Sequence, residues 1–399
     1  MGSGEGAGTA EPALEGRWRF ELASPGGPLP FFVELEGGGG ALVDAHERLP
    51  FSSVEVDGSR VRLEIAHYDS VLEGHLEGGM LRGEWRRRSP GKGQYTVMPF
   101  EARPATGQAR FQAAEGTRGV LDGDWNLRFT EEDGGSFEGQ ARLRSVDAGG
   151  TPGVEGTILT DTGDYRFLEG ARIGDELHLS VFDGAHAFLF TAHIEGEALV
   201  DGHFWSRDSY HATFEGTPPP ADASALADPM SIVELRSEDG RFHFDFPQLG
   251  GGRLDEADPR FDGKVVLIEV FGTWCPNCND QAPLMSEWHR TYGPRGLEVV
   301  GIAFEFTGDR DDDMEMLARY AERYEVDYPL LLGGSNDKAE ASKALPDLSR
   351  VAAYPTTIFV GRDGTVRSIY SGFSGPATGP AYERLQAQFE STIETLLAE

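Results

Sequence analysis

The amino-acid sequence predicts an all-β region of antiparallel strands followed by an α/β domain, and three observations carry this prediction. Apolar and polar residues alternate from about residue 14 to residue 217, which is the pattern of half-buried strands. Residues 217–225 are rich in proline, which cannot donate backbone hydrogen bonds to a sheet. Beyond this stretch, the continuous apolar run at residues 265–271 is typical of a strand buried on both faces.

Length and charge limit the classes of protein to which the chain belongs. With 399 residues, and at roughly 150 residues per domain, we expect two to three domains. The 67 acidic and 35 basic residues give a net charge of −32, which excludes nucleic acid as a partner because phosphate backbones would be repelled. The one local basic run is at residues 86–88. The sequence contains no run of 18 apolar residues, so it predicts no membrane-spanning helix.

Residues 1–13 predict a flexible N-terminal tether. They are rich in glycine and small residues and have neither the charged nor the apolar segment of an export signal. We therefore expect such a signal to be absent from this chain or removed. If it was removed, the protein could be tethered to a membrane through that signal.

The β region repeats its own pattern. The segment Gly16-Arg17-Trp18 returns as Gly123-Asp124-Trp125, and two further segments recur in the same order. This predicts duplication of a unit of about 100 residues, as two tandem antiparallel barrels or sandwiches or as one closed sheet with a unit in each half. The repeats are placed at residues 14–104 and 118–217, with a linker at 218–236. The aromatic residues that recur at matched or neighbouring positions are expected to fill cores rather than bind ligands: Trp18, Trp85, Trp125 and Phe204.

The α/β domain is predicted over residues 237–399 in the order β-α-β-α-β-β-α. The predicted strands lie at residues 265–271, 297–306, 328–332, 356–360 and 366–370, and the predicted helices at 276–292, from Asp311 onward, and at 379–397. The three aspartates at residues 311–313 suit the positive end of a helix and lack the residue spacing of a calcium loop.

Cys275 and Cys278 are the two cysteines of the chain, and their C-x-x-C spacing at a predicted helix start indicates a redox pair. Free N–H groups and the helix dipole favour a thiolate at Cys275, which we interpret as the nucleophile. Cys278 is close enough to attack a mixed disulfide and release the substrate. Two alternatives are a zinc half-site, for which His289 lacks a partner, and a structural disulfide, which would close a very short loop.

The residues around these cysteines resemble the thioredoxin superfamily. Trp274 precedes Cys275, Pro283 lies within the following helix, and Tyr354-Pro355-Thr356-Thr357 precedes a later strand. Within the superfamily, residues 237–399 are similar to the exported TlpA/ResA-type thiol-disulfide oxidoreductases.

The resemblance implies a thioredoxin fold, a cis peptide bond before Pro355, and a Tyr354 backbone that binds the substrate chain, with Trp274 also positioning the substrate. It further implies protein thiols or disulfides as substrates and re-reduction by a membrane thiol carrier, without a diffusible cofactor or a metal. The implied location is the periplasm or another compartment outside the cytoplasm.

Glu269 stands six residues before Cys275, inside the apolar strand. Burial there should raise its pKa, so that Glu269 could take the proton of Cys278. The alternative is a side chain that reaches solvent or pairs with Lys264. At the position where ResA-type proteins place a glutamate this chain has Gln281, with Asp280 beside it, which makes Glu269 the better candidate.

The sequence therefore predicts a thiol-disulfide oxidoreductase, more as a reductant than as an oxidant. One alternative is a β module that binds a partner protein or an apolar ligand, with the α/β domain in an accessory role. Another is a thiol peroxidase of the same fold. Five histidines in the second repeat are interpreted as solvated or core residues rather than a metal site: His178, His186, His193, His203 and His211.

Overall fold

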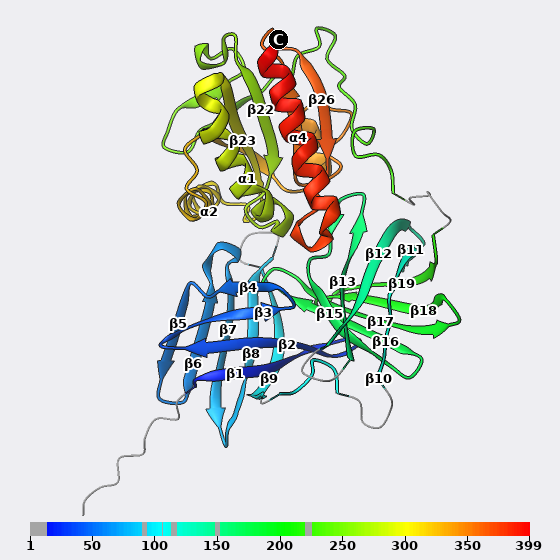
Figure 1. Cartoon of the computed structure of the whole chain (residues 1–399). Coiled ribbons are helices and arrows are strands. Elements are labelled where there is room, and N and C mark those ends of the chain that lie inside the picture. Colours follow the sequence, from blue (N-terminus) through cyan, green and yellow to red (C-terminus); the bar gives the residue numbers. More distant parts are fainter. Residues whose placement is uncertain (1–13, 90–93, 106, 113–117, 148–151, 220–225) are drawn as a thin grey trace, which may run out of the picture.

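A computed structural model describes residues 14–89, 94–105, 107–112, 118–147, 152–219 and 226–399 (Figure 1). The predicted tether at 1–13 lies outside the described residues, and so do residues 220–225 of the predicted linker. Within the described ranges, none of the helices has the length and apolar character needed to cross a membrane.

The N-terminal region is all-β, as predicted, and begins with a nine-stranded antiparallel sheet. The strand order β4-β3-β2-β1-β9-β8-β7-β6-β5 leaves β4 and β5 as edges, so this sheet is an open half-barrel. Its strands are β1 (Gly16–Ser24), β2 (Gly27–Glu36), β3 (Gly39–Asp44), β4 (Glu47–Pro50), β5 (Ser53–Asp57), β6 (Arg60–Ile65), β7 (Ser70–Glu77), β8 (Met80–Arg88) and β9 (Tyr95–Pro104).

The second sheet closes on itself. Its strands are β10 (Arg118–Gly119), β11 (Gly123–Glu131), β12 (Ser136–Asp147), β13 (Pro152–Thr160), β14 (Gly163–Asp164), β15 (Leu168–Ile173), β16 (Glu176–Phe182), β17 (Ala187–Glu195), β18 (Ala198–Ser206) and β19 (Tyr210–Thr217). Pairing between β13 and β15 completes an eight-stranded barrel. The two units therefore differ in closure, and the duplication stays a prediction.

Aromatic side chains at the recurring positions fill the two β cores, as expected. Trp18 and Trp85 are buried in the open sheet, and Trp125 and Phe204 in the barrel. Two of the buried indole N–H groups have an acceptor in the fold: that of Trp85 donates to Ser70 Oγ at 2.8 Å, and that of Trp125 donates to the Glu197 carbonyl at 2.7 Å. Trp85 and Trp125 therefore bury apolar surface without leaving the indole N–H unpaired.

A buried arginine joins the open sheet to the barrel. The Arg110 side chain is 1% exposed and donates to the carboxylates of Asp44 at 2.5 Å and Glu169 at 2.8 Å. It also donates to the carbonyls of Pro30 and Ser180 at 3.4 Å. Burial raises the pKa of Asp44 to about 7, while the Arg110 charge opposes that rise. Arg110 is therefore the cation that neutralises a buried acidic pair between the two β units.

Replacing Arg110 by methionine should destabilise the β region by about 3 to 5 kcal/mol, because two buried carboxyl groups lose their counter-ion. The measurement is urea unfolding followed by tryptophan fluorescence. Arg60→Met is the control, since Arg60 pairs with Glu73 on the exposed surface and should cost about 1 kcal/mol or less. Equal destabilisation by both variants would show that Arg110 has no special role.

The C-terminal region is an α/β unit with the predicted sheet. In the order β24-β23-β22-β25-β26, strands β22, β23 and β24 are parallel to one another, and β25 is antiparallel to both of its neighbours, β22 and β26. Its strands are β22 (Val265–Phe271), β23 (Leu297–Glu305), β24 (Leu330–Ser335), β25 (Thr356–Val360) and β26 (Val366–Ser371), preceded by the ribbon β20 (Asp245–Pro247) and β21 (Arg253–Asp255). Its helices are α1 (Pro276–Tyr292), α2 (Arg310–Arg323), α3 (Lys338–Ala344) and α4 (Pro380–Ala398). Short 3-10 turns lie at Ala66–Tyr68, Pro259–Phe261, Gly293–Arg295 and Pro376–Thr378.

Part of the predicted linker contacts the α/β unit. Val233 is buried in the core of that unit, and Leu235 forms an isolated β-bridge with Leu348. The backbone N–H of Arg236 donates to the Asp347 carbonyl at 2.6 Å. The chain is therefore already packed on the α/β unit before residue 237.

The α/β unit sits on both β units, with β22 pointing toward them (Figure 1). Two members of the basic run in β8 make this contact. Arg88 pairs with Asp312 of α2 at 2.5 Å, and Arg87 donates to the carbonyl of Trp274 at 3.2 Å. The one basic cluster that the sequence singled out is thus used within the protein.

Candidate active site

The two cysteines lie where β22 passes into α1. Cys275 is the N-cap of α1, and its Sγ accepts a hydrogen bond from the backbone N–H of Cys278 at 3.4 Å. Pro276 follows at the first helical position, where a missing N–H costs nothing. Both cysteines are free thiols, with Cys275 6% exposed and Cys278 fully buried. Cys275 is therefore the more accessible of the two thiols.

Three residues predicted to position the substrate surround Cys275. The Cys275 thiol donates to the carbonyl of Tyr354 at 3.4 Å, and the peptide bond between Tyr354 and Pro355 is cis. The ring of Trp274 meets that of Tyr354 edge-on, with centroids 5.6 Å apart, and its indole N–H donates to the Phe304 carbonyl at 2.8 Å. Trp274 and Tyr354 thus form one rigid wall beside the thiol.

Glu269 is buried in the centre of the sheet. Its side chain is fully shielded from solvent, and neither carboxyl oxygen has a hydrogen-bond partner among the described residues. Burial raises its pKa well above the ordinary value, and the charge of Cys275 raises it further. The alternative that Glu269 reaches solvent or pairs with Lys264 is therefore wrong.

Cys278 is protonated at neutral pH for the same physical reason. Burial raises its pKa well above the ordinary value, the hydrogen bond and charge of Cys275 add to this rise, and the charge of Glu269 contributes as well. Cys278 and Glu269 therefore influence each other's protonation inside the protein.

The helix position at which the resemblance implied a glutamate carries the neutral Gln281. Gln281 is fully buried, and its Nε2 donates to Thr357 Oγ1 on β25 at 2.8 Å. The neighbouring Asp280 turns outward and pairs with Arg166 of the barrel. Neither side chain supplies a second buried carboxylate beside the cysteines.

A second buried acid, which the sequence analysis missed, supports the loop before Cys275. Glu305 ends β23 and accepts hydrogen bonds from the backbone N–H of Thr273 at 2.8 Å and from its hydroxyl at 2.9 Å. Burial raises the pKa of Glu305 to about 8. The sequence did contain a signal for Glu305, which is an acidic residue at the end of an apolar strand. Glu269 was singled out on similar grounds, as an acidic residue inside an apolar strand.

The barrel histidines do not converge on one point. His203 Nδ1 lies 3.0 Å from His211 Nε2, whereas His178 pairs with Glu176 and His186 pairs with Asp183. The described part of the chain contains no group of three or more histidine, cysteine or acidic side chains placed to hold a metal. Asp311, Asp312 and Asp313 lie in the first turn of α2, as expected, and Asp309 caps this helix by accepting from the N–H of Asp311 at 3.1 Å.

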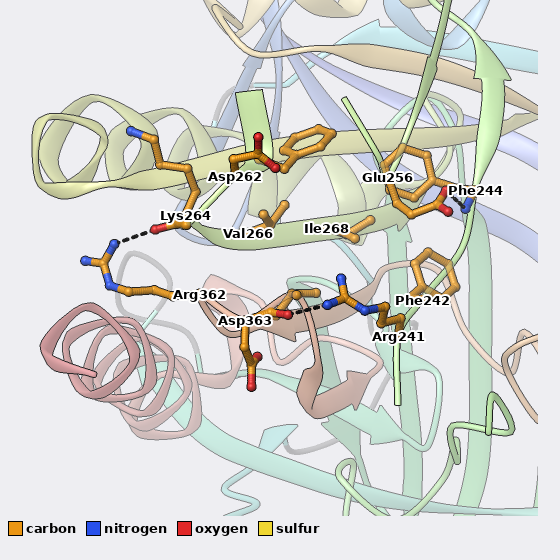
Figure 2. Close-up of a pocket in the computed structure, with 14 residues that line it drawn as sticks. Arg241, Phe242, Phe244, Glu256, Asp262, Lys264, Val266, Ile268, Arg362 and Asp363 are labelled. Carbon is orange, nitrogen blue, oxygen red and sulfur yellow. Dashed lines mark hydrogen bonds between the residues drawn. The ribbon is translucent and has the colours of Figure 1, made fainter. Parts of the chain in front are cut away.

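A separate pocket of about 170 Å³ lies at the other end of β22 (Figure 2). Its apolar floor includes Val266 and Ile268. Two arginine side chains at its rim form hydrogen bonds with backbone carbonyls. Arg362 donates to the Gly263 carbonyl at 2.9 Å, and Arg241 donates to the Asp363 carbonyl at 2.6 Å. These contacts lie near the start of the central strand β22, whereas Cys275 follows the end of that strand.

The fold and the cysteine pair at a helix start define a thioredoxin-like domain. Residues 242–369 match the model of the AhpC/TSA family. The chain is 23% identical over 124 residues to the thiol-disulfide oxidoreductase ResA of Bacillus thuringiensis subsp. konkukian, which covers 31% of this chain and 63% of that protein.

Two further proteins show the same likeness. The thioredoxin-like protein YneN of Bacillus subtilis is 26% identical over 129 residues, which is 32% of this chain and 68% of YneN. A solved thiol:disulfide interchange protein from Chlorobium tepidum is 21% identical and covers 40% of this chain and 95% of its own, with a TM-score of 0.31. The chain thus spans about two thirds of the length of these curated relatives.

Proposed function

We propose that this protein is a thiol-disulfide oxidoreductase that reduces disulfides in other polypeptides. The observation that carries the proposal is Cys275 at the N-cap of α1, with the N–H of Cys278 bonded to its sulfur and the Cys278 thiol buried beneath it. The Cys275 thiolate attacks one sulfur of the substrate disulfide. A Cys275–substrate bond forms, the substrate S–S bond breaks, and one substrate thiolate leaves.

In the second step Cys278 resolves this mixed disulfide. Its thiol loses a proton and attacks Cys275 Sγ, so that the Cys275–Cys278 disulfide forms and the second substrate thiolate leaves. Two electrons have then passed from the protein to the substrate. Glu269 is the group we assign to accept the proton of Cys278, because it is buried beside the pair and shares its electrostatic field.

The mixed disulfide itself prepares Glu269 for this role. While Cys275 is a thiolate, its negative charge raises the pKa of both Glu269 and Cys278. Bonding to the substrate removes that charge and lowers the pKa of both groups, so Glu269 first gives up its own proton to solvent and its carboxylate can then accept the proton of Cys278. Proton release is in this way tied to formation of the adduct.

The resemblance of this domain supplies the rest of the proposal. The backbone of Tyr354, the cis-proline Pro355 and the side chain of Trp274 position the substrate polypeptide. A membrane thiol carrier re-reduces the cysteine pair, and the protein works in the periplasm or another extracytoplasmic compartment. We assign it no cofactor and no metal.

The reduction potential of the Cys275–Cys278 couple should lie nearer to about −270 mV than to about −120 mV, the values of a reductant and an oxidant of this fold. Equilibration of the full chain with dithiothreitol or glutathione buffers, followed by thiol alkylation and mass spectrometry, measures it. A value near the oxidant would reverse the proposed direction. Rapid consumption of hydrogen peroxide by the reduced chain would instead favour a thiol peroxidase.

A further inference from the structure

A turn of the barrel lies directly against the reactive cysteine loop. We name residues 161–166, which include β14, the covering turn. A Cβ atom added at Gly163 would stand 2.0 Å from Asn277 Nδ2 in the C-x-x-C motif and 3.5 Å from the Phe373 carbonyl. One added at Gly372 would stand 3.1 Å from the Asp161 carbonyl. The covering turn therefore lies against the Asn277 side chain at the start of α1 and against the backbone of the loop after β26, with no space for another chain at these two contacts.

The second of these loops borders the substrate-positioning segment. The N–H of Gly372, directly after β26, donates to the Pro355 carbonyl at 2.9 Å. The covering turn thus bridges the start of α1 and the loop beside Pro355, and these flank Cys275 from two sides. Tyr354 and Asn277, like Cys275, are buried.

Asp164 holds the covering turn to both loops. Its carboxylate accepts from the N–H of Gly375 at 2.7 Å. The side-chain amide of Asn277 faces Asp164. When its nitrogen and oxygen are oriented so that both have partners, the nitrogen donates to the Asp164 carboxylate at 3.2 Å and the oxygen accepts from the Asp164 N–H at 3.3 Å. Because Asp164 is buried, these bonds are shielded from water and correspondingly strong.

Arg166 ties the turn to three other segments. Its side chain is 4% exposed and pairs with Asp280 of α1 and with Glu47 of the open sheet. Its Nε lies 3.6 Å from the carboxylate of Asp183 in the barrel. A single guanidinium therefore connects the open sheet, the barrel and the helix that begins at the reactive cysteine.

We propose that the covering turn occupies the surface beside Cys275 that a polypeptide disulfide needs, so that such a substrate reacts only after the turn has moved away. This inference rests on the proposed function. A polypeptide bonded to Cys275 needs room along its backbone, whereas a small disulfide needs room for a few atoms. The covering turn therefore makes the site discriminate between disulfides by size.

The charges at the contact are compatible with such a movement. Separation of the units returns Arg166, Asp280 and Glu47 to water, and their hydration offsets much of the lost attraction. An interface between domains of one chain is commonly mobile when it is polar. The reaction rate with a polypeptide is then the intrinsic rate multiplied by the open fraction.

The test uses the chain with Cys278→Ser, in which Cys275 is the one remaining cysteine. Gly163→Trp is added as a wedge, and Gly16→Trp is the matched control, because Gly16 also has a positive φ but no atom within 4 Å of an added Cβ. Mass spectrometry follows adduct formation with cystamine, a small disulfide, and with insulin. The wedge should raise the insulin rate by about tenfold or more while the cystamine rate changes by less than about threefold. The control should leave both rates near those of the parent.

An insulin rate that is the same in wedge, control and parent overturns the covering role. If cystamine and insulin both fail to react with every variant, the proposed thiol chemistry fails first and the covering role falls with it. Hydrogen exchange on the chain without the wedge gives a second test should the wedge variant not fold. The amides of Arg166 and Gly375, both bonded to Asp164, should lose protection in the insulin adduct and keep it in the cystamine adduct. Unchanged protection in the insulin adduct overturns the proposal.

Discussion

Cys278→Ser should accumulate a covalent adduct with a polypeptide disulfide, and Cys275→Ser should not. Cys275 is the more exposed thiol and is bonded to a helix N–H, so it forms the mixed disulfide, while Cys278 is needed to break it. Each substitution should lower disulfide turnover by on the order of a thousandfold or more, because both residues act as one unit. Turnover is measured by insulin reduction, and the adduct by intact mass after acid quench.

The asymmetry between the two variants is the decisive feature. Cys275→Ser retains a thiol, but that thiol is fully buried and its pKa is raised by burial. Ala282→Ser, in the same helix, is a control for a buried hydroxyl in α1, and it should leave turnover within about threefold of the parent because it keeps both cysteines. Equal adduct formation by the two cysteine variants would mean that nucleophile and resolver are assigned wrongly.

Local signals in the sequence predicted the α/β unit well. The bounds of α1 agree with the prediction, because Pro276 suits the first helical position and Gly293 follows the last helical residue. Strands β22 and β25 agree as well, since buried strands appear as short continuous apolar runs. The seven-residue helix α3 was missed because so short a segment has too little periodicity to recognise.

Local sequence patterns did not predict how the strands of the β region are arranged. Alternation predicted strands, yet it carries no information on whether the first and last strands of a unit meet, so it did not predict that the barrel closes while the other sheet stays open. Arg110 joins groups 59 and 66 positions away in the chain. These pairings depend on tertiary packing rather than on any nearby pattern.

The same reason explains what was missed at the candidate site. The sequence singled out Trp274, Cys275 and Cys278 because they are close together in the chain, and Pro355 because a proline before a later strand belongs to the same resemblance. The contact of Arg166 with Asp280 crosses 114 positions, so the sequence did not indicate that the barrel packs against the helix that begins at Cys275. This tertiary contact is one of the observations behind our proposal that a turn of the barrel restricts access to Cys275.

Glu269→Gln should leave formation of the Cys275 adduct nearly unchanged and slow its resolution by about a hundredfold at pH 6. The amide cannot accept the proton of Cys278, and at this pH few Cys278 thiolates form unaided. The difference should shrink toward pH 8. Rapid quench of the two steps separates them, with Glu298→Gln on the neighbouring strand as the control, because that side chain is partly exposed. Unchanged release between pH 6 and 8 would remove Glu269 from the mechanism.

The stability of the same variant provides an independent check on the buried carboxyl. Burial raises the folded-state pKa of Glu269, so the stability that its neutral form provides is fully present below the unfolded pKa of about 4.3 and is lost as pH rises toward the folded pKa. Glutamine stays neutral throughout and escapes this loss. Urea unfolding should therefore show Glu269→Gln at least as stable as the parent at pH 5, with an advantage that grows toward pH 8, whereas Glu298→Gln should show no such trend. A variant that loses stability relative to the parent as pH rises would mean that Glu269 is ionised in the folded protein and has a cationic or hydrogen-bonding partner.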